Sequence, residues 1–578
     1  MLDIVQRMRY GWPWFLLAGL MLAVYWPSFW AQYINYDDPG HFLNGLFSKP
    51  GSIFLTGNSV YKTYVPLSII SAYIENIFFK TNPHVTHIIN FLLHGCVVFL
   101  IFHLACRLGV KKPAAYIAAL IFAVHPMHVE SVAWATERKG LLYANFYLMA
   151  LLFYCDYADT KAARAYVFAL ACALLSVLSK PMALSLPLVL FLIDYMRGRG
   201  LSLAGVMDKV PFFLVVEPVV LITYLQNSRH LDMVWPGALM LWAWCGAFYI
   251  NTFFWPAHLL PLYGPPVMEG FSLVAQIFLP VAGSAGAWLV LREATRKWIV
   301  FALFFYFLST FFLWRFDIVQ DLNFVADRFM YLPSFGFCLL VGVVVHEWFL
   351  SLQVVRQKIL FWMVILVILT SMIYKSCQQV RVWDNGVRFF SCILEERPGM
   401  FFALVGRIRA VLGVDPVFER GGDDDIRQSV DPRYWRAVAR RQGGEVEIQR
   451  KTFYLRQLWA LRDLRVLAQN YAGSASYNCY SAVVHENWCH NNNAACGKSL
   501  DAYSLAIGVA GNNAQLFFGR GRLALKMNRN KAALRDALTA IKLSPGTAAY
   551  HELAVLSALH GRDVVLAKHL FARFQRQR

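Results

Sequence analysis

The sequence has 578 residues, of which 58% are hydrophobic and 16% are aromatic, and its mean hydropathy is +0.45. Because a soluble globular protein is usually about half apolar, this composition excludes an ordinary water-soluble protein and indicates a chain embedded in a bilayer. The formal net charge is +19, of which residues 401–578 contribute +12, with 26 Lys and Arg against 14 Asp and Glu. The sequence therefore predicts an apolar body followed by a basic soluble tail.

The first apolar run, residues 12–30, is interpreted as a retained helix rather than a signal peptide. It follows Arg7 and Arg9, and no small-residue cleavage motif precedes the next stretch, YINYDD. At about 15 to 20 apolar residues per crossing, the sequence predicts eleven membrane spans. These spans are residues 12–30, 85–107, 113–128, 141–157, 164–180, 182–196, 210–226, 272–291, 298–314, 331–350 and 359–375.

Basic loops predict the orientation of the spans, because Lys and Arg accumulate on the cytoplasmic side. That side holds Arg7 and Arg9 and the loops at 106–113, 160–166, 196–200, 291–298 and 356–358. The outer side then holds YDDPGH, HPMHVESVAWATERKG, RFDIVQDLNFVADR and the whole C-terminus. Two further apolar stretches, 61–79 and 237–262, break this alternation, so we expect them to lie in or against the outer interface.

The tail is expected to contain helical repeats. Residues 514–545 place small or terminating residues where a tetratricopeptide repeat has them, so that paired helices can approach closely: Gly521, Ala533, Ala540 and Pro545. A weaker second unit covers 548–578, and an ordinary amphipathic hairpin is the alternative interpretation. The predicted fold is all-α, with a membrane domain at 1–380, an extracytoplasmic connecting region at 381–510 and repeats at 511–578.

Three of the 11 cysteines, Cys479, Cys489 and Cys496, lie in the tail. In an oxidising compartment we expect two of them to pair and one to be left over. Their spacing with nearby histidines could also suggest zinc, but no paired C-x-x-C motif is present, so we expect no metal.

The predicted outer side gathers ionisable residues. Two adjacent carboxylates, Asp37 and Asp38, follow the first span, although Asp before Pro-Gly also commonly caps a turn. The same side carries His125, His128, Glu130, Glu137, Arg138, Lys139, Lys180, Asp327 and Arg328. Any one of these could be a snorkelling side chain. Together they predict a site, because ionisable groups at this depth are costly and usually functional.

This combination of charges suits a lipid-phosphate-linked donor whose isoprenoid tail stays in the bilayer. Cations bind a phosphate at headgroup level, and a carboxylate can remove the proton of an attacking hydroxyl. We predict Asp37 and Asp38 as catalytic, and as donor-phosphate or substrate-binding residues His125, His128, Glu130, Arg138, Lys139, Lys180, Asp327 and Arg328. Carboxylates and phosphate could hold Mg²⁺ or Mn²⁺, but the cations can supply the same charge, so no cofactor is expected.

Five blocks across residues 30–385 resemble the tetratricopeptide-repeat membrane glycosyltransferases, bacterial relatives of the eukaryotic transmembrane O-mannosyltransferases. The blocks are YDDPGH, HPMHVESVAWATERKGLLYANFYLMALLFY, LLSVLSKPMALSLPLVLFLIDYM, FWPAHLLPLYGPP and VADRFMYLPSFGFCLLV. These enzymes are similar to the wider group of C-type glycosyltransferases (GT-C), whose first outer loop holds an acidic pair, commonly Asp-Glu. The resemblance therefore implies a base role for the Asp37-Asp38 pair, with Asp37 as first choice. The tail departs from the family, whose members usually carry several good repeats.

The resemblance implies a GT-C-like multi-pass protein of a bacterial inner membrane, with its C-terminal domain in the periplasm. It implies transfer of a sugar from a polyprenyl-phosphate or polyprenyl-diphosphate carrier to a Ser or Thr hydroxyl of an exported protein, such as a pilin or other surface protein. The implied partners are this donor, the acceptor and membrane lipids, with no nucleic acid. Two alternatives stay open: a glycan or lipid acceptor, and a non-enzymatic transporter or flippase. Transporters tend to show repeated halves and broken central helices, and neither is seen in the sequence.

Overall fold

The structure is a computed structural model, and it describes residues 2–42, 64–200, 202–226, 237–264, 266, 271–314, 324–412, 460, 463, 466, 481, 493–509, 513–545 and 548–577. The chain divides into two compact units, Met1–Phe389 and Phe390–Arg578. Throughout the described ranges every regular element is a helix and there is no strand. The prediction of an all-α protein is confirmed.

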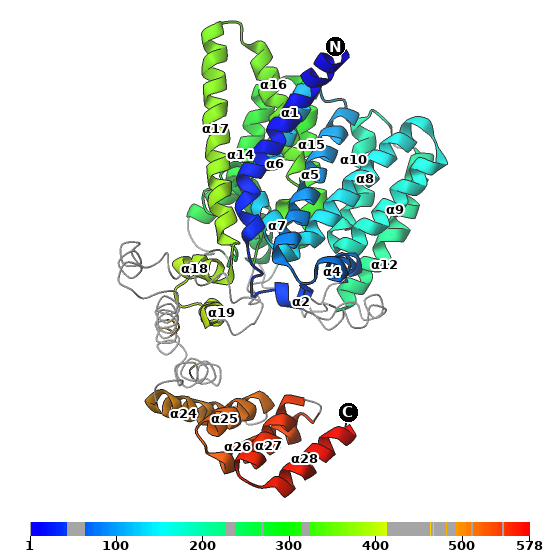
Figure 1. The fold of residues 1–578 in the computed structure, drawn as a ribbon. Helices are drawn as coiled ribbons and strands as arrows, with labels where there is room; N and C mark the ends of the chain where they lie inside the picture. Colours follow the sequence, from blue (N-terminus) through cyan, green and yellow to red (C-terminus); the bar gives the residue numbers. More distant parts are fainter. Residues whose placement is uncertain are drawn as a thin grey trace. The chain divides into compact units, whose positions relative to one another are not determined.

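The first unit is a bundle of apolar helices (Figure 1). Its α-helices in chain order are α1 (Leu2–Tyr25), α2 (Asp38–Phe42), α4 (Pro66–Phe79), α5 (Pro83–Arg107), α6 (Lys112–Val124), α7 (Val129–Ala133), α8 (Arg138–Thr160), α9 (Ala163–Ser179), α10 (Leu186–Met196), α11 (Leu203–Met207), α12 (Val210–Gln226), α13 (Gly237–Phe254), α14 (Phe271–Val290), α15 (Glu293–Thr310), α16 (Phe335–Ser351) and α17 (Val355–Val382). Short 3-10 turns connect several of them: η1 (Trp26–Trp30), η3 (Pro126–His128), η4 (Ala135–Glu137), η5 (Pro181–Ser185), η6 (Phe311–Leu313) and η7 (Asp327–Met330).

Helices occur at all eleven predicted spans, and proline marks where several of them begin. In α5, Pro83 occupies the first turn, where its missing N–H costs nothing, and the side chain of Asn82 accepts a hydrogen bond from the N–H of His84 (3.0 Å). Five described helices are long and apolar enough to cross a membrane, or six if one bent pair is a single span, and six other apolar helices are shorter. These helices indicate a multi-pass membrane protein, while the number of eleven crossings stays a prediction.

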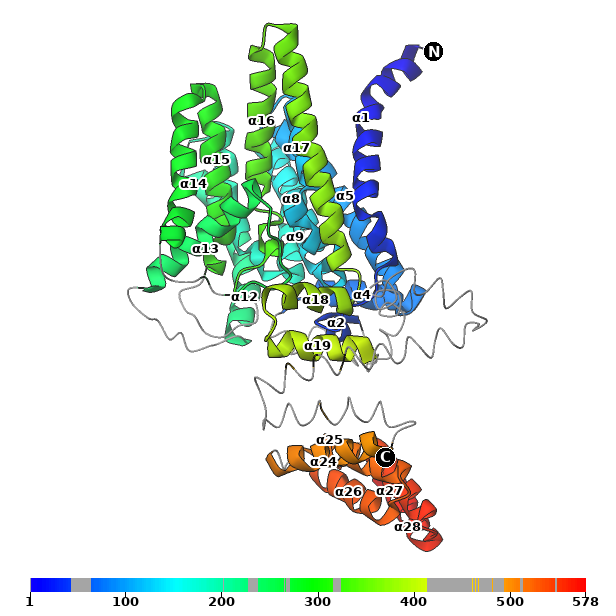
Figure 2. The same ribbon diagram turned by 90° about the vertical axis from the view of Figure 1, so that its left-hand side faces the viewer.

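The predicted cytoplasmic loops lie together at one end of the bundle. Arg107, at the end of α5, forms ion pairs with Asp156 (2.7 Å) and Asp159 (2.8 Å) near the end of α8. Arg197, after α10, also pairs with Asp159. These contacts bring three basic connections to the same end, where Figures 1 and 2 also show the N-terminus.

The opposite end is built from broken helices. After α6 the chain bends by 54° and continues through η3 and α7. Pro126 lies at this break, and His125 before it has an extended backbone, as a residue preceding proline prefers. The short segments α7 and η4, the start of α8 and η7 therefore meet at this end, together with α2 and α4 (Figures 1 and 2). The predicted interfacial placement of 61–79 and 237–262 falls on α4 and α13 and stays a prediction.

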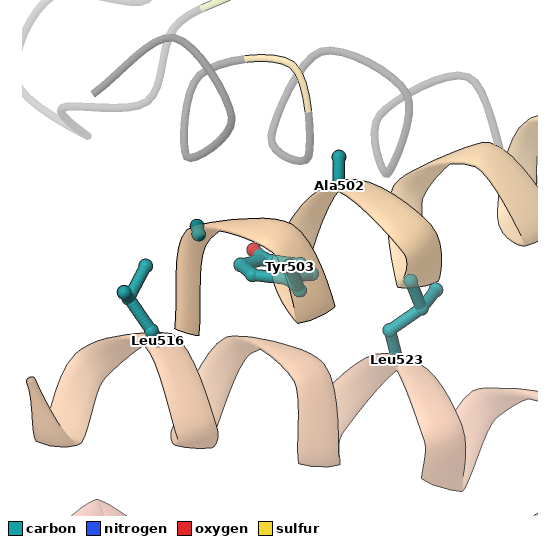
Figure 3. Close-up of a cluster of buried hydrophobic side chains, with 5 residues drawn as sticks. Ala502, Tyr503, Leu516 and Leu523 are labelled. Atoms are coloured by element: carbon teal, nitrogen blue, oxygen red, sulfur yellow. The ribbon is translucent and has the colours of Figure 1, made fainter. Parts of the chain in front are cut away.

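The second unit contains α19 (Phe401–Leu412), α24 (Asn493–Val509), α25 (Ala514–Lys526), α26 (Asn530–Leu543), α27 (Ala548–His560) and α28 (Val564–Gln577), while α18 (Gly386–Glu396) spans the division between the units. From α24 to α28 each helix packs on the next. Figure 3 shows Leu516 and Leu523 of α25 pointing toward α24, whose Tyr503 belongs to the same buried cluster. A Cβ atom on Gly521 would lie 3.1 Å from Cβ of Asp536, so this glycine allows α25 and α26 to approach closely. The assignment to tetratricopeptide repeats stays a prediction.

Cys496 is disulfide-bonded. The other two tail cysteines of the predicted set, Cys479 and Cys489, lie outside the described residues.

Candidate functional site

The acidic loop that follows the first span is held in place by contacts on several sides. The N–H of Gln32 donates a hydrogen bond to the carbonyl of Asp384 (2.8 Å). The ring of Tyr36 stacks on Trp134 and on Phe389, with centroid distances of 5.6 Å in both cases. The backbone immediately before Asp37 is therefore fixed by packing.

Asp38 is the structural member of the acidic pair. Its side chain is buried, and Oδ2 accepts a hydrogen bond from the N–H of Ile34 (2.7 Å). Oδ1 accepts from both the N–H (3.1 Å) and the hydroxyl (2.5 Å) of Thr136 in η4. Burial raises the pKa of Asp38 to about 7, against the opposing effect of these donors. Asp38 thus ties the acidic loop to the segment that carries the next site residue, Glu137.

Asp37 is half-buried. Burial raises the pKa of its carboxyl group, the positive charges of Lys139 and Arg328 lower it, and the charge of Glu137 raises it further. Asp37 therefore lies within electrostatic reach of Lys139 and Arg328. Its position suits a group that meets a substrate, whereas that of Asp38 suits a group that holds the loop.

Three cations surround one carboxylate next to this pair. Glu137 is fully buried, and its oxygens lie 2.9 Å from Nζ of Lys180, 3.4 Å from Nζ of Lys139 and 3.8 Å from Nε of Arg328. We call Lys139, Lys180 and Arg328 the cation triad. Without Glu137 between them, these like charges would repel one another in a poorly solvated setting.

Aromatic rings and one glycine shape the surroundings of the cation triad. Nζ of Lys139 and Cζ of Arg328 lie 5.5 and 5.4 Å from the ring centre of Trp134, which is within cation–π range. A Cβ atom at Gly140 would lie 2.7 Å from Oε2 of Glu137 and 3.5 Å from Nζ of Lys180. A side chain at position 140 would therefore force the carboxylate of Glu137 to shift.

Two acidic residues lie next to Arg328: Glu130, which contacts it directly, and Asp327, which precedes it in the chain. Nη1 and the backbone N–H of Arg328 donate to the two oxygens of Glu130, at 2.5 and 2.9 Å. Asp327 is buried, and the hydroxyl of Tyr263 lies 3.0 Å from its Oδ1. Burial and the nearby charge of Glu130 raise the pKa of Asp327 well above its ordinary value. Glu130 therefore orients the guanidinium of Arg328, and the contact of Asp327 with Tyr263 holds the neighbouring backbone.

Arg138 is held by several protein groups, and its predicted contact with phosphate stays a prediction. Its guanidinium is fully buried and donates to Glu75 (2.5 Å), to Oδ1 of Asn90 (3.0 Å) and to the carbonyl of Thr86 (3.0 Å). It joins α4, α5 and α8. In the sequence, Arg138 cannot be told from Lys139 because the two are adjacent and both basic, yet only Lys139 takes part in the cation triad.

His125 and His128 are also held by protein groups. Nε2 of His125 lies 3.1 Å from the carbonyl of Phe253, and its Nδ1 accepts from the N–H of Met127 (3.2 Å). The ring nitrogens of His128 lie 2.7 Å from the carbonyl of Phe122 and 2.7 Å from Oγ of Ser334. Both rings brace the broken helix, and their predicted substrate contacts stay a prediction.

Sequence reasoning missed three features of the site. In the sequence Glu137 is one of several charged residues on the predicted outer side, whereas in the structure it lies at the centre of the cation triad. Glu75, a single acid within an apolar stretch, could have been recognised as the partner of a buried cation, since such an acid is costly unless paired. No local pattern signalled the stack of Tyr36 on Trp134.

An apolar groove of about 960 Å³ lies between α13, α14, α15 and α16. His258 lies at its margin, and the carbonyl of His258 is 3.3 Å from the hydroxyl of Tyr263. The same hydroxyl contacts Asp327, the neighbour of Arg328. A chain of direct contacts therefore links the margin of the groove to the cation triad.

No group of three or more His, Cys, Asp or Glu side chains within the described ranges is arranged to hold a metal ion. The cation triad can bind a phosphate, and Asp37 can accept a proton beside it. This pairing is what a transfer from a phosphate-linked donor to a hydroxyl requires.

Comparison with known proteins finds relatives that are named as transferases. The chain is 22% identical to protein O-mannosyl-transferase TMTC3 of Mus musculus and of Homo sapiens, over 94% of this chain and 65% of theirs. It is 30% identical to protein O-mannosyl-transferase TMTC1 of Homo sapiens over 154 residues, which is 24% of this chain and 17% of that protein. The chain is related to the TMTC protein O-mannosyltransferases.

The relationship to the TMTC proteins confirms the resemblance inferred from the sequence blocks. No family model matches the chain. The matched region spans 65% of the length of the TMTC3 proteins.

Proposed function

We propose that this chain is a glycosyltransferase that moves a sugar from a polyprenyl-phosphate-linked donor to a Ser or Thr hydroxyl of an exported protein. The observation that carries the proposal is that Asp37 lies within electrostatic reach of Lys139 and Arg328, two members of the cation triad that Glu137 holds together. The relationship to proteins named O-mannosyltransferases supports a protein acceptor.

The proposed reaction assigns one task to each side chain. Asp37 accepts the proton of the acceptor hydroxyl as its oxygen forms a bond to the anomeric carbon of the sugar. The bond from that carbon to the phosphate oxygen breaks, and its electron pair leaves with the polyprenyl phosphate. Lys139, Lys180 and Arg328 stabilise the negative charge that grows on the phosphate.

The cation triad is preorganised for this task. Glu137 already holds the three cations together, so they need not be gathered against their repulsion when the donor binds. Arg328 is fixed by Glu130. The ordering cost of binding is therefore reduced before any substrate arrives.

The apolar groove supports a donor with an isoprenoid tail. It is open and lined mainly by aliphatic and aromatic side chains of membrane helices, and its margin is linked to Asp327 through Tyr263. A tail in this groove would place its phosphate toward Arg328.

The tail unit supports a polypeptide acceptor. Within the described parts of α24–α28 nine Lys and Arg residues are exposed, against three acidic residues. A basic helical array favours an acidic or polar polypeptide. We propose that the tail lies in the periplasm of a bacterium and presents exported proteins to the membrane site.

The proposal is tested with the purified full-length chain, a polyprenyl-phosphate-linked sugar and a Ser/Thr peptide. The matched control is the same peptide with Ala in place of Ser and Thr. The wild type should transfer sugar to the first peptide and not to the second, and Asp37→Asn should transfer to neither. Sugar release without any transfer, or transfer that Asp37→Asn leaves unchanged, would contradict the proposed reaction.

A further inference from the structure

A partly buried ion-pair clamp joins three consecutive helices of the tail. Nε and Nη2 of Arg520 in α25 donate to the two oxygens of Asp536 in α26, at 2.9 and 2.8 Å. Nη1 of the same guanidinium donates to Oγ of Ser504 in α24 (3.1 Å). One arginine thus ties its own helix to the helix before it and to the helix after it.

The same clamp occurs a second time, earlier in the tail. Nε and Nη2 of Arg407 in α19 donate to the two oxygens of Asp463, at 2.8 and 2.5 Å. Nη1 of Arg407 donates to Oγ of Ser391 in α18 (3.1 Å). In both places Nε and Nη2 bind the two oxygens of an aspartate and Nη1 binds the hydroxyl of a serine.

The residues before each arginine also correspond. Gly406 precedes Arg407 and is covered by the ring of Phe390, while Gly519 precedes Arg520 and is covered by the ring of Tyr503. In each case the aromatic residue lies 16 positions before the glycine, and the serine lies 16 positions before the arginine. Each glycine and arginine belong to a matching stretch, GRIRAVL in α19 and GRGRLAL in α25.

The residues around each aspartate correspond as well. Asp463 and Asp536 each end the same four letters, ALRD. The alanine that begins this motif is fully buried in both places, at Ala460 and Ala533. Both aspartates and both alanines are helical.

Among the residues compared, the two copies differ only in the spacing between the arginine and the aspartate. The aspartate follows the arginine by 16 positions in the second copy, from 520 to 536, and by 56 positions in the first, from 407 to 463. We infer that the tail contains two copies of one helical unit and that 40 extra residues are inserted in the first copy, between its arginine helix and its aspartate helix.

This inference changes the extent of the repeat array. The sequence placed the repeats at 511–578, whereas the first clamp starts in α18, directly after the last long apolar helix. The array that can contact a polypeptide therefore begins more than a hundred residues earlier. The inserted residues are an addition to the first copy and are not needed to build it.

The inference does not depend on enzymatic activity and can be tested on the folded full-length chain. Residues 414–456 are replaced by Met-Asn-Arg, the sequence of the second copy at 527–529, which restores the spacing of 16 between arginine and aspartate. Limited proteolysis over a temperature series, read by mass spectrometry, reports the tail separately from the membrane unit. The shortened chain should keep a protease-resistant tail with an unchanged unfolding temperature.

Arginine substitutions provide the matched controls. In the shortened chain Arg407→Met should lower the unfolding temperature of the tail by several degrees, because a carboxylate at Asp463 would lose its partner, and Arg520→Met should have a similar effect. A shortened chain whose tail is degraded at all temperatures, while the intact chain is resistant, would contradict the inference.

A second variant tests the same inference without deleting any residue. A site for a specific protease is inserted between Gly421 and Gly422 of the intact chain, and as a control between Asn528 and Arg529 in the turn of the second copy. After cleavage at the first position the two fragments should stay associated and keep the unfolding temperature of the uncut tail. Separation of the fragments would show that the first copy needs the continuous segment, and would overturn the inference.

Discussion

Asparagine substitutions at Asp37 and Asp38 should fail in different ways, although the residues are adjacent. Asp37→Asn keeps size and polarity but removes the base, so turnover should fall by on the order of 10² to 10⁴ with no loss of stability. In Asp38→Asn, an amide NH₂ would replace one carboxylate oxygen and face a donor, either the N–H of Ile34 or the two donors of Thr136. A buried donor left without an acceptor costs about 1 to 3 kcal/mol.

The assay measures two quantities on each purified variant. Sugar transfer to a Ser/Thr peptide gives turnover, and thermal unfolding together with membrane abundance gives stability. Asp37→Asn should lose turnover at a wild-type unfolding temperature. Asp38→Asn should show a lower unfolding temperature, and its turnover should recover in part on cooling, as the acidic loop re-forms.

Three results would refute this assignment of roles. Near-normal turnover in both variants would remove the pair from the mechanism and leave a turn-capping role, since Asn is itself a good turn residue. A stable Asp38→Asn with a 10³-fold loss, beside a nearly active Asp37→Asn, would reverse the two roles. Equal destabilisation of both would show that Asp37 also holds the loop.

Four further predictions follow from the site and the tail. Arg328→Ala should raise the donor concentration needed for half-maximal rate, because a charge-assisted hydrogen bond is worth about 1.5 to 3 kcal/mol, and titration with a short-tailed donor measures this. Arg138→Gln should instead destabilise the chain by about 3 to 5 kcal/mol by leaving Glu75 unpaired, and a second change, Glu75→Gln, should restore part of that loss in thermal unfolding. Because burial raises the pKa of Asp37 and the base acts deprotonated, the rate should fall as pH drops through a value above the usual range of an aspartate, and a pH–rate profile should show this limb in the wild type and in Asp37→Glu. Deleting residues 511–578 should lower transfer to a native protein more than transfer to a short peptide, and equal losses in parallel assays would indicate a folding role.

Much of the fold could be predicted from the sequence because hydrophobicity determines it directly. A helix that faces lipid must be apolar over a length set by the bilayer, so each of the eleven predicted spans coincides with a helix. The start of α5 at Asn82 and Pro83 depends on local capping, which acts within a few residues. Broken helices such as the one at Pro126 were less visible, since apolar residues continue across the break.

The candidate site could be predicted only as a set of charges on one side. The sequence indicates that Arg138, Lys139 and Arg328 are basic and lie outside the spans, but whether a cation faces a substrate or a buried carboxylate depends on three-dimensional contacts. Glu75 lies 63 positions from Arg138 in the sequence and is its closest partner in space. Long-range pairs of this kind carry no local signal.

The repeat in the tail shows a different limit. Its GR-x-R and ALRD motifs are visible in the sequence, yet 40 inserted residues displace one of them, so that no fixed period appears. The matching bonds of Arg407 and Arg520 reveal the correspondence that spacing conceals.

The central claim is that this chain transfers a sugar to exported proteins and uses Asp37 to do so. Its most direct test is mass spectrometry of exported proteins from cells that carry no copy, the wild-type chain or Asp37→Asn, with equal membrane abundance of the last two. The account predicts a sugar on Ser or Thr of at least one exported protein in the wild type alone. Identical glycosylation in all three, or in the wild type and Asp37→Asn, would contradict it.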